Sequence, residues 1–199
     1  EQVCYDIKDL GVKYLTVYAF STENWKRSRE EVDGLMKLFR SYLKKCIKIS
    51  RDNKMKIKII GDISAFAPDI QESIHKLEEF SKDYDELYFQ IAMNYGSRDE
   101  ITRGMKKMAQ DVADGKLSPD EVTESRIESY LDTAGVPDPD LLIRTSGEQR
   151  LSNFLMWQLA YTEFYFTDVA WPDFHKPELI QAIEKYNQRD RRYGGVKEE

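Results

Sequence analysis

The sequence has 199 residues, a length typical of one compact domain. Hydrophobic residues make up 41% of the chain and suffice for a packed core, so the composition excludes a disordered or collagen-like protein. The formal net charge of −6 argues against a nucleic-acid-binding module, which needs a basic face, so we expect no nucleic-acid partner.

The cysteines and histidines limit the chemistry that the chain can perform. Cys4 and Cys46 are too few for a disulfide scaffold, which indicates a reducing, cytoplasmic location. His75 and His175 match no zinc-binding spacing. No apolar run approaches the roughly 18 residues that a membrane-spanning helix needs.

The first half of the chain predicts alternating helices and strands. Apolar residues recur with helical spacing from the outset, and β-branched and aromatic residues crowd the stretch 12–20, as they do in buried strands. In chain order we expect a helix over 3–10, a strand over 12–20, a helix over 29–50 with an apolar stripe that includes Ile47, a strand over 55–60, a helix from Pro68 with an apolar face that includes Phe80, and a strand over 87–93.

The second half continues the alternation with shorter elements. We expect a helix over 99–113, a helix over 124–133, a strand over 141–144, a helix that begins near Ser152, a strand over 164–166 and a closing helix over 177–187. Strands that alternate with helices and are apolar along most of their length predict an α/β fold. We expect a single domain with a central, mostly parallel sheet flanked by helices.

Ligands of such sheets bind beyond the carboxyl ends of the strands, which directs attention to the segments after Phe20 and Ile143. Arg144 stands where the predicted strand becomes a loop, and Arg150 and Ser152 follow shortly. Two guanidinium groups beside the start of a helix capped by Ser152 would suit a phosphate or diphosphate. The equally weighted alternative is that an arginine forms an ion pair at the rim of the sheet, with Glu148 or Asp140.

The segment 21–27 directly follows the first predicted strand and combines a hydroxyl, a carboxylate, an amide, an indole and cations. Such a mixture could line a substrate site. Considered alone, the segment favours a simpler interpretation, in which Asn24 turns the chain, Trp25 packs under the next helix and Arg27 is solvated.

Glu163 precedes an aromatic stretch and offers a single carboxylate. Such a group could bind a hard cation such as magnesium, shared with phosphate oxygens. On its own, however, one carboxylate more often forms an ion pair.

Taken together, these segments resemble the cis-prenyltransferase family, and within it the bacterial undecaprenyl diphosphate synthases. The resemblance runs from about residue 11 to 195. It rests on motifs over 18–27, 59–62, 94–98, 140–148, 152–155, 157–158, 163 and 171–174, among them Ser21-Thr22-Glu23-Asn24-Trp25-Lys26-Arg27, Asn94-Tyr95-Gly96-Ser97-Arg98 and Ile143-Arg144-Thr145-Ser146-Gly147-Glu148.

The resemblance implies repeated cis addition of isopentenyl diphosphate to an allylic diphosphate, usually farnesyl diphosphate. The product would be a long-chain polyprenyl diphosphate, such as the undecaprenyl carrier-lipid precursor of cell-wall synthesis. In this reaction the allylic C–O bond ionises, the homoallylic double bond attacks and a proton leaves, so no covalent enzyme nucleophile is needed. The protein must hold two polyanions together and give the growing hydrocarbon a dry channel.

The resemblance also implies roles for individual residues. Arg144, Arg150 and Ser152, with Leu151 in the same segment, would hold the diphosphate of isopentenyl diphosphate. Glu163 would be a ligand of the cofactor Mg²⁺. Asn24 stands at the family position for proton removal, but an amide is a poor base, so we expect it to orient the substrate. The remaining substrate-lining positions would be Ser21, Thr22, Glu23, Trp25 and Arg27.

Other family features are less specific in this chain. Met36, Phe39 and Leu43 would form a wall of the product tunnel, and core packing explains them equally well. Arg192-Tyr193-Gly194 matches an Arg-x-Gly element that reaches a partner subunit's active site, although a frayed basic tail is the simpler interpretation. The resemblance implies a homodimer and at most peripheral contact with the inner face of the membrane.

One departure from the family concerns the amino-terminal segment. The family's first strand ends in Asp-Gly-Asn-Gly-Arg-Trp, which supplies an essential aspartate and a diphosphate-cradling loop, and this hexapeptide does not occur in residues 1–199. We expect residues 1–199 to be a single cis-prenyltransferase domain that lacks its amino-terminal strand, because Glu1 already lies within a helical pattern. The alternatives are that this polypeptide is inactive as it stands, or that it is the non-catalytic partner of a heteromeric cis-prenyltransferase.

Overall fold

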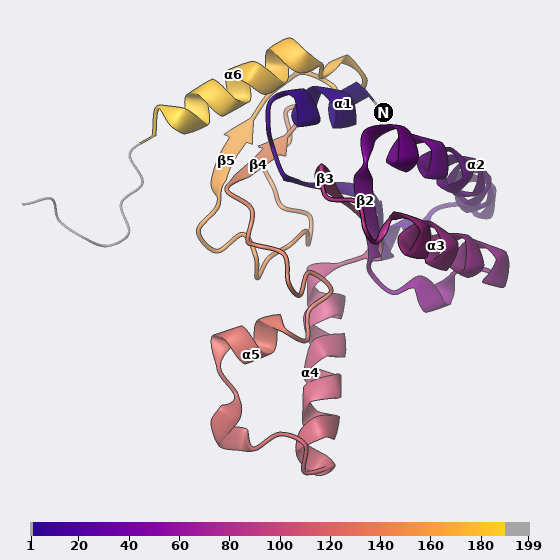
Figure 1. Ribbon diagram of the computed structural model, residues 1–199, viewed down its shortest axis with the longest axis vertical. Coiled ribbons are helices and arrows are strands. Elements are labelled where there is room, and N and C mark those ends of the chain that lie inside the picture. Colours follow the sequence, from indigo (N-terminus) through magenta and orange to yellow (C-terminus); the bar gives the residue numbers. More distant parts are fainter. Residues whose placement is uncertain (1, 190–199) are drawn as a thin grey trace, which may run out of the picture.

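The computed structural model describes residues 2–189 and confirms an α/β fold with parallel strands flanked by helices (Figure 1). The strands fall into a larger sheet with the order β1-β3-β2 and a smaller sheet, β4-β5, and every pairing in this part of the chain is parallel. The strands are β1 (Tyr14–Ser21), β2 (Met55–Ile60), β3 (Leu87–Tyr95), β4 (Leu141–Arg144) and β5 (Glu163–Phe166).

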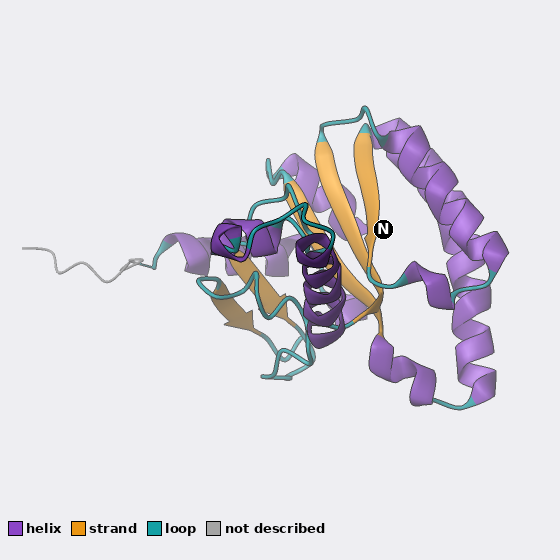
Figure 2. Cartoon of the chain, turned by 90° about the horizontal axis from the view of Figure 1, so that it is seen from below, coloured by secondary structure: helices purple, strands orange, loops and turns teal. Residues whose placement is uncertain are grey.

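Helices lie around the strands of both sheets (Figure 2). They are α1 (Gln2–Asp9), α2 (Arg29–Asn53), α3 (Pro68–Ser81), α4 (Ser97–Ala113), α5 (Glu124–Glu128) and α6 (Lys176–Asn187). Local chemistry sets their ends. The Ser28 hydroxyl accepts the N–H of Glu31 at the start of α2, and Lys54 ends that helix in the left-handed conformation at φ 52°.

The main core lies between the larger sheet and helices α2 and α3. Alternate residues of β2 and β3 face it, as the two-residue period of a strand requires. Its fully or almost fully buried members include Leu43, Cys46, Met55, Ile57, Ile70, Ile74, Leu77, Leu87, Phe89 and Ile91. Cys4 is buried in the same core. None of the helices described between residues 2 and 189 combines the length and apolar character needed to cross a bilayer.

The opposite face of the sheet carries a second core near the carboxyl ends of its strands. There Ile60, Ala92 and Tyr95 contact Phe154 and Leu155 from a later segment. Helix α4 leaves this region and runs away from the sheets, with α5 beside it (Figure 1). The segment that carries Ser152 therefore packs directly onto the larger sheet.

The outer edge of β2 is covered by side chains. The N–H groups of Ile57, Ile59 and Gly61 donate to Ser81 Oγ (3.0 Å), Glu78 Oε1 (2.9 Å) and Asp132 Oδ2 (3.0 Å), respectively. These bonds satisfy backbone donors that would otherwise invite another strand to pair. They also tie the turn after β2 to the segment that follows α5.

Several sequence-based expectations are wrong. Residues 152–161 form a series of turns and not a helix, so Ser152 is not a helix cap. Its φ of 51° and those of Asn153 (63°) and Leu155 (45°) are left-handed, which a continuous helix cannot accommodate. The helix predicted over 124–133 ends at Glu128. Ile47 and Phe80, expected on apolar faces, are 36% and 42% exposed because each lies at the margin of its helix's packed face.

Candidate active site

The candidate site lies where β1, β3 and β4 end. Ser21, the last residue of β1, pairs in register with Tyr95, the last residue of β3, and Arg144 is the last residue of β4. The segments 21–27 and 144–152 therefore both begin at carboxyl ends of parallel strands. This is the position at which α/β proteins bind ligands.

The loop after β1 is a short 3₁₀ helix, Thr22–Lys26, held by its own side chains. The backbone N–H of Ser21 donates to Asn24 Oδ1 at 2.8 Å, and the Thr22 hydroxyl donates to Glu23 Oε2 at 3.1 Å. Asn24 thus stabilises a turn, as the simpler interpretation of this segment predicts. Arg27 is exposed, as that interpretation also predicts.

Trp25 anchors this loop to the end of the sheet. Its indole N–H donates to Asn94 Oδ1 at 2.7 Å. Its ring packs against Phe20 and Phe66, with centroid distances of 5.1 and 5.9 Å. Because 37% of Trp25 remains exposed, the indole combines an anchoring contact with a free surface beside Asn24.

The second segment brings Arg144 and Ser152 together. Arg144 Nη2 lies 3.5 Å from Ser152 Oγ, a long hydrogen-bond distance. Arg150 forms an ion pair with Glu148, so the predicted rim ion pair is present for this arginine. Leu151, between Arg150 and Ser152 in the sequence, packs against the second core. Two cations and a hydroxyl therefore lie along one short stretch.

The two segments meet through Glu23. Asn153 Nδ2 donates to Glu23 Oε1 at 3.2 Å, although 130 positions separate the two residues in the sequence. Burial alone would raise the pKa of Glu23, but hydrogen bonds from its own backbone and from the side chains of Asn153, Ser21 and Thr22 outweigh burial and hold the pKa below its ordinary value. Glu23 is therefore an ionised carboxylate that already accepts hydrogen bonds from its neighbours.

Tyr18 of β1 contacts the segment that follows Ser152 and was not predicted as a site residue. Its hydroxyl donates to the backbone oxygen of Tyr95 at 2.9 Å, and its ring stacks on Phe154. Burial raises the pKa of Tyr18 to about 12; the Glu23 carboxylate acts in the same direction and Arg144 opposes it. Both charged groups therefore act on one hydroxyl. In the sequence Tyr18 is one more aromatic residue of a buried strand, so the pattern does not single it out.

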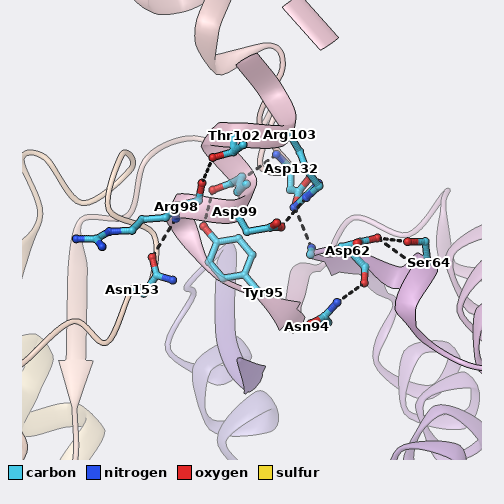
Figure 3. Close-up of polar contacts among 12 residues, drawn as sticks. Asp62, Ser64, Asn94, Tyr95, Arg98, Asp99, Thr102, Arg103, Asp132 and Asn153 are labelled. Atoms are coloured by element: carbon cyan, nitrogen blue, oxygen red, sulfur yellow. Dashed lines mark hydrogen bonds and ion pairs between the residues drawn. The ribbon is translucent and has the colours of Figure 1, made fainter. Parts of the chain in front are cut away.

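A buried hydrogen-bond network lies beside the end of β3 (Figure 3). The Tyr95 hydroxyl donates to Glu100 Oε2 at 2.5 Å, and the Asp132 N–H donates to Glu100 Oε1 at 2.9 Å. The Gln158 amide donates to both carboxylate oxygens, and Arg103 donates two bonds to Asp132. Burial is the main cause that raises the pKa of Glu100. This network joins β3, α4 and the turns after α5 and Ser152.

Glu163 lies away from the other candidate residues. It starts β5 and pairs with Leu141, whereas Arg144 pairs with Phe166 three positions further along the strands. Its carboxylate forms an ion pair with Arg189. Over residues 2–189, no three side chains of His, Cys, Asp or Glu gather as a metal-binding group. The structure thus shows the ion pair that the sequence left as an alternative to a metal ligand.

The structure does not show a product tunnel at the predicted wall. Met36, Phe39 and Leu43 are buried in the main core, where Phe39 packs against Phe20 and Phe66. Core packing therefore explains these side chains. Arg192-Tyr193-Gly194 lies outside the described residues.

Comparison with known proteins identifies the family. A family model described as putative undecaprenyl diphosphate synthase matches residues 1–194. The isoprenyl transferase of Clostridium perfringens is 50% identical over 188 residues, which cover 94% of this chain and 74% of the relative. The isoprenyl transferase of Agrobacterium fabrum is 47% identical over 191 residues, which cover 96% of this chain and 77% of the relative.

Solved structures agree with this assignment. Lavandulyl diphosphate synthase from Lavandula x intermedia, solved with dimethylallyl diphosphate, has a TM-score of 0.93 at 37% identity and covers 98% of this chain and 84% of its own. A probable undecaprenyl diphosphate synthase from Campylobacter jejuni has a TM-score of 0.87 at 34% identity. The match covers 98% of this chain and 89% of the Campylobacter chain. These relatives do not favour a non-catalytic partner subunit. The chain belongs to the undecaprenyl diphosphate synthase family and is a cis-prenyltransferase.

Proposed function

We propose that the site at the ends of β1, β3 and β4 binds isopentenyl diphosphate beside an allylic diphosphate, with farnesyl diphosphate as primer and a long-chain polyprenyl diphosphate as product. One observation carries this proposal: the Asn153–Glu23 hydrogen bond joins the arginine-bearing segment to the loop after β1. Two segments with complementary chemistry therefore meet at the carboxyl ends of strands from the two sheets. Holding two substrates side by side is the main requirement of a condensation without a covalent intermediate.

Arg144, Arg150 and Ser152 are proposed to hold the diphosphate of isopentenyl diphosphate, with Leu151 keeping their spacing. Arginine forks suit phosphate oxygens because they donate parallel hydrogen bonds. The Arg150–Glu148 pair does not prevent this role, because the Arg150 side chain is 65% exposed and such surface pairs contribute only about 0–1 kcal/mol. A doubly charged phosphate can therefore displace the carboxylate.

The loop with Ser21, Thr22, Glu23, Trp25 and Arg27 is proposed to line the allylic site. The Asn24 side-chain oxygen already accepts the N–H of Ser21, so this amide is proposed to orient the substrate and not to accept its proton. The diphosphate leaves the allylic carbon, the homoallylic double bond attacks that carbon, and a proton is lost from the adduct. The Arg27 guanidinium of this loop would favour these steps by stabilising the negative charge on the departing diphosphate.

Mg²⁺ belongs to the general chemistry of this family, and the resemblance predicts Glu163 as a ligand. The described residues do not fit a complete metal site, because the Glu163 carboxylate is paired with Arg189 and belongs to no acidic group there. Mg²⁺ binding at Glu163 therefore stays a prediction. The roles proposed above rest on the arginines, the hydroxyl and the loop after β1.

We propose that the complete domain contains a further parallel strand between β1 and β4. Among residues 2–189, β1 pairs with β3 alone and β4 with β5 alone, so each has an edge without a partner strand. Leu142 and Ile143 of β4 pack against the two cores of the larger sheet. The family's strand with Asp-Gly-Asn-Gly-Arg-Trp would suit this position, so activity is best measured on the full-length gene product.

A homodimer with peripheral membrane contact is proposed from the resemblance. Tyr161, Phe166 and Trp171 are 79%, 38% and 52% exposed, and large aromatic side chains are enriched at protein interfaces. Sedimentation velocity of the full-length protein tests the dimer. Co-sedimentation with vesicles, with and without the polyprenyl product, tests the membrane contact.

Incorporation of radiolabelled isopentenyl diphosphate into butanol-soluble product tests the reaction. We expect the full-length protein to incorporate label with farnesyl diphosphate and Mg²⁺ present. Arg144→Gln is expected to raise the KM for isopentenyl diphosphate about tenfold or more, because one charge-assisted contact is lost. Arg51→Gln, on the exposed face of α2, is the matched control. Absence of incorporation by the unsubstituted protein would overturn the proposal.

A further inference from the structure

The turns after Ser152 adopt a conformation that their own sequence does not favour. Ser152, Asn153 and Leu155 are all left-handed, a region that non-glycine residues enter at a cost. No regular helix or strand includes residues 151–161. Contacts with the rest of the protein must therefore hold this segment, and with it Arg150 and Ser152, in place.

Asn153 makes several of these contacts at once. Its backbone oxygen accepts the N–H of Ser97 at 2.7 Å, and its side-chain oxygen accepts the N–H of Arg98 at 2.9 Å. Figure 3 shows this second bond at the start of α4. Asn153 thus satisfies two donors of the first turn of a helix that is distant in sequence, a task usually performed by the residue just before the helix. That preceding residue here is Gly96, which has no side chain to cap with.

The side-chain amide nitrogen of Asn153 forms a hydrogen bond to the loop after β1. While its amide oxygen is held at the start of α4, its amide nitrogen donates to Glu23 Oε1 at 3.2 Å. A Cβ atom at Gly96 would lie 2.7 Å from both Asn153 Nδ2 and Thr22 Oγ1. The absence of a side chain at Gly96 therefore permits the loop after β1 and the Asn153 amide to approach each other closely.

We infer that Asn153 is a positioning residue that uses the start of α4 as a fixed support and sets the distance between the loop after β1 and the segment that carries Arg150 and Ser152. The amide suits this position because it offers an acceptor towards Arg98 and a donor towards Glu23. The inference rests on the proposed function, since the two segments are those proposed to hold the two diphosphates. Asn153 itself need not touch either substrate.

The inference is tested by exchanging the hydrogen-bond donor and acceptor between the side chains of Asn153 and Glu23. Asn153→Asp keeps an acceptor for the Arg98 N–H, and an aspartate is a good partner for a helix start. It also places a carboxylate against Glu23, so the link across the site is lost. Glu23→Gln in the same protein restores a donor opposite the new carboxylate.

Steady-state kinetics of the full-length protein give the decisive comparison. We expect Asn153→Asp to lower kcat/KM for isopentenyl diphosphate about tenfold in the natural background and less than about twofold in the Glu23→Gln background, because only the first pair repels. Asn187→Asp, exposed at the end of α6, controls for the added negative charge. Equal losses in both backgrounds, or no loss from Asn153→Asp alone, would overturn the inference.

Amide hydrogen exchange separates this inference from the proposed reaction. Asn153→Asp is expected to leave the Ser97 and Arg98 amides protected while exchange across residues 21–26 accelerates, and Glu23→Gln is expected to reverse that acceleration. Unchanged exchange across 21–26 in Asn153→Asp would overturn the link whatever the activity. An inactive natural protein with the expected exchange pattern would instead overturn the proposed function and leave the link established.

Discussion

The indole N–H of Trp25 donates to the side-chain oxygen of Asn94 at 2.7 Å and so joins the loop after β1 to the end of β3. Asn94 is 5% exposed, has a left-handed φ of 47°, and donates its own amide to the backbone oxygen of Asp62 at 2.7 Å. One buried amide thus connects the segments that follow β1 and β2 to the end of β3. These two bonds give the loops after β1 and β2 a common reference point at the candidate site.

Asn94→Ala is expected to lower the free energy of unfolding by about 2–3 kcal/mol. The substitution leaves the Trp25 N–H and the Asp62 carbonyl without their partner and places alanine in the left-handed region. Urea unfolding of the natural and substituted proteins measures the loss. Asn94→Gly, which tolerates the backbone conformation, separates the two causes. A loss below about 0.5 kcal/mol in both variants would contradict the importance of this bond.

Gly61 is expected to tolerate no side chain. Its φ is +114°, and a Cβ atom there would overlap the backbone oxygen of Met93 and lie 2.9 Å from that of Asn94. We expect Gly61→Ala to destabilise the protein by roughly 3 kcal/mol or more, because backbone atoms must move.

Gly34→Ala is the matched control for this substitution. Gly34 lies within α2, and no neighbouring atom lies within 4 Å of the Cβ that alanine would add. Here alanine is expected to stabilise the protein by about 0.5–1 kcal/mol, because glycine is a poor helix former. Thermal unfolding of the two variants should therefore shift in opposite directions.

The raised pKa of Glu100 predicts a specific pH dependence of stability. The folded protein holds this proton more tightly than the unfolded chain does. The resulting contribution to stability is complete below the ordinary pKa of 4.5 and is lost as the pH rises through the higher pKa of the folded state. Relative to Glu100→Gln, the natural protein should thus lose stability as the pH rises above the ordinary pKa of 4.5.

Urea unfolding at several pH values measures this difference. Glu72→Gln serves as the control, because the pKa of exposed Glu72 is lowered by Lys76 and its contribution has the opposite sign. Parallel pH curves for the natural protein and Glu100→Gln would show that burial does not govern the ionisation of Glu100.

The Arg103–Asp132 pair is expected to stabilise the end of the larger sheet. Two guanidinium nitrogens donate to the Asp132 carboxylate at 2.9 and 2.6 Å, and the same carboxylate accepts the N–H of Gly61. Arg103→Lys is expected to cost about 1–2 kcal/mol, since a single ammonium cannot replace the fork.

Arg40→Lys provides a comparison with an exposed fork. Arg40 donates two bonds to Asp69 on the surface, and exposed pairs contribute about 0–1 kcal/mol. Equal losses of the free energy of unfolding in the two variants would show that the Arg103 pair contributes no more than a surface contact.

Regular elements with a strong local pattern were predicted well from the sequence. The 25-residue helix α2 has a serine cap, a capping-box glutamate and a repeating apolar stripe, and it begins at the predicted Arg29. The strand β2 matches its predicted range 55–60 because alternating apolar residues and the glycine after it are local signals. The sequence also places Arg144 at the end of a strand.

The segment after Ser152 shows where local reasoning fails. Ser152 has the chemistry of a helix cap, and the apolar residues that follow recur at helical spacing, yet the chain forms turns. The N–H groups of Ser97 and Arg98 at the start of α4 and the Glu23 carboxylate bind Asn153 there, and these partners lie more than 50 positions away in the sequence. Their contacts outweigh the local helical preference.

By itself the sequence determined the fold class, the family and the identity of the charged and hydroxyl groups at the strand ends. Composition, periodicity and motif order can be recognised along the chain without knowledge of its tertiary contacts. Only the tertiary structure decided that Asn153 joins Glu23 to the start of α4, that Tyr18 stacks on Phe154, and that Glu163 pairs with Arg189. These relationships join segments far apart in the sequence. No local pattern encodes them, because packing alone determines which donor meets which acceptor.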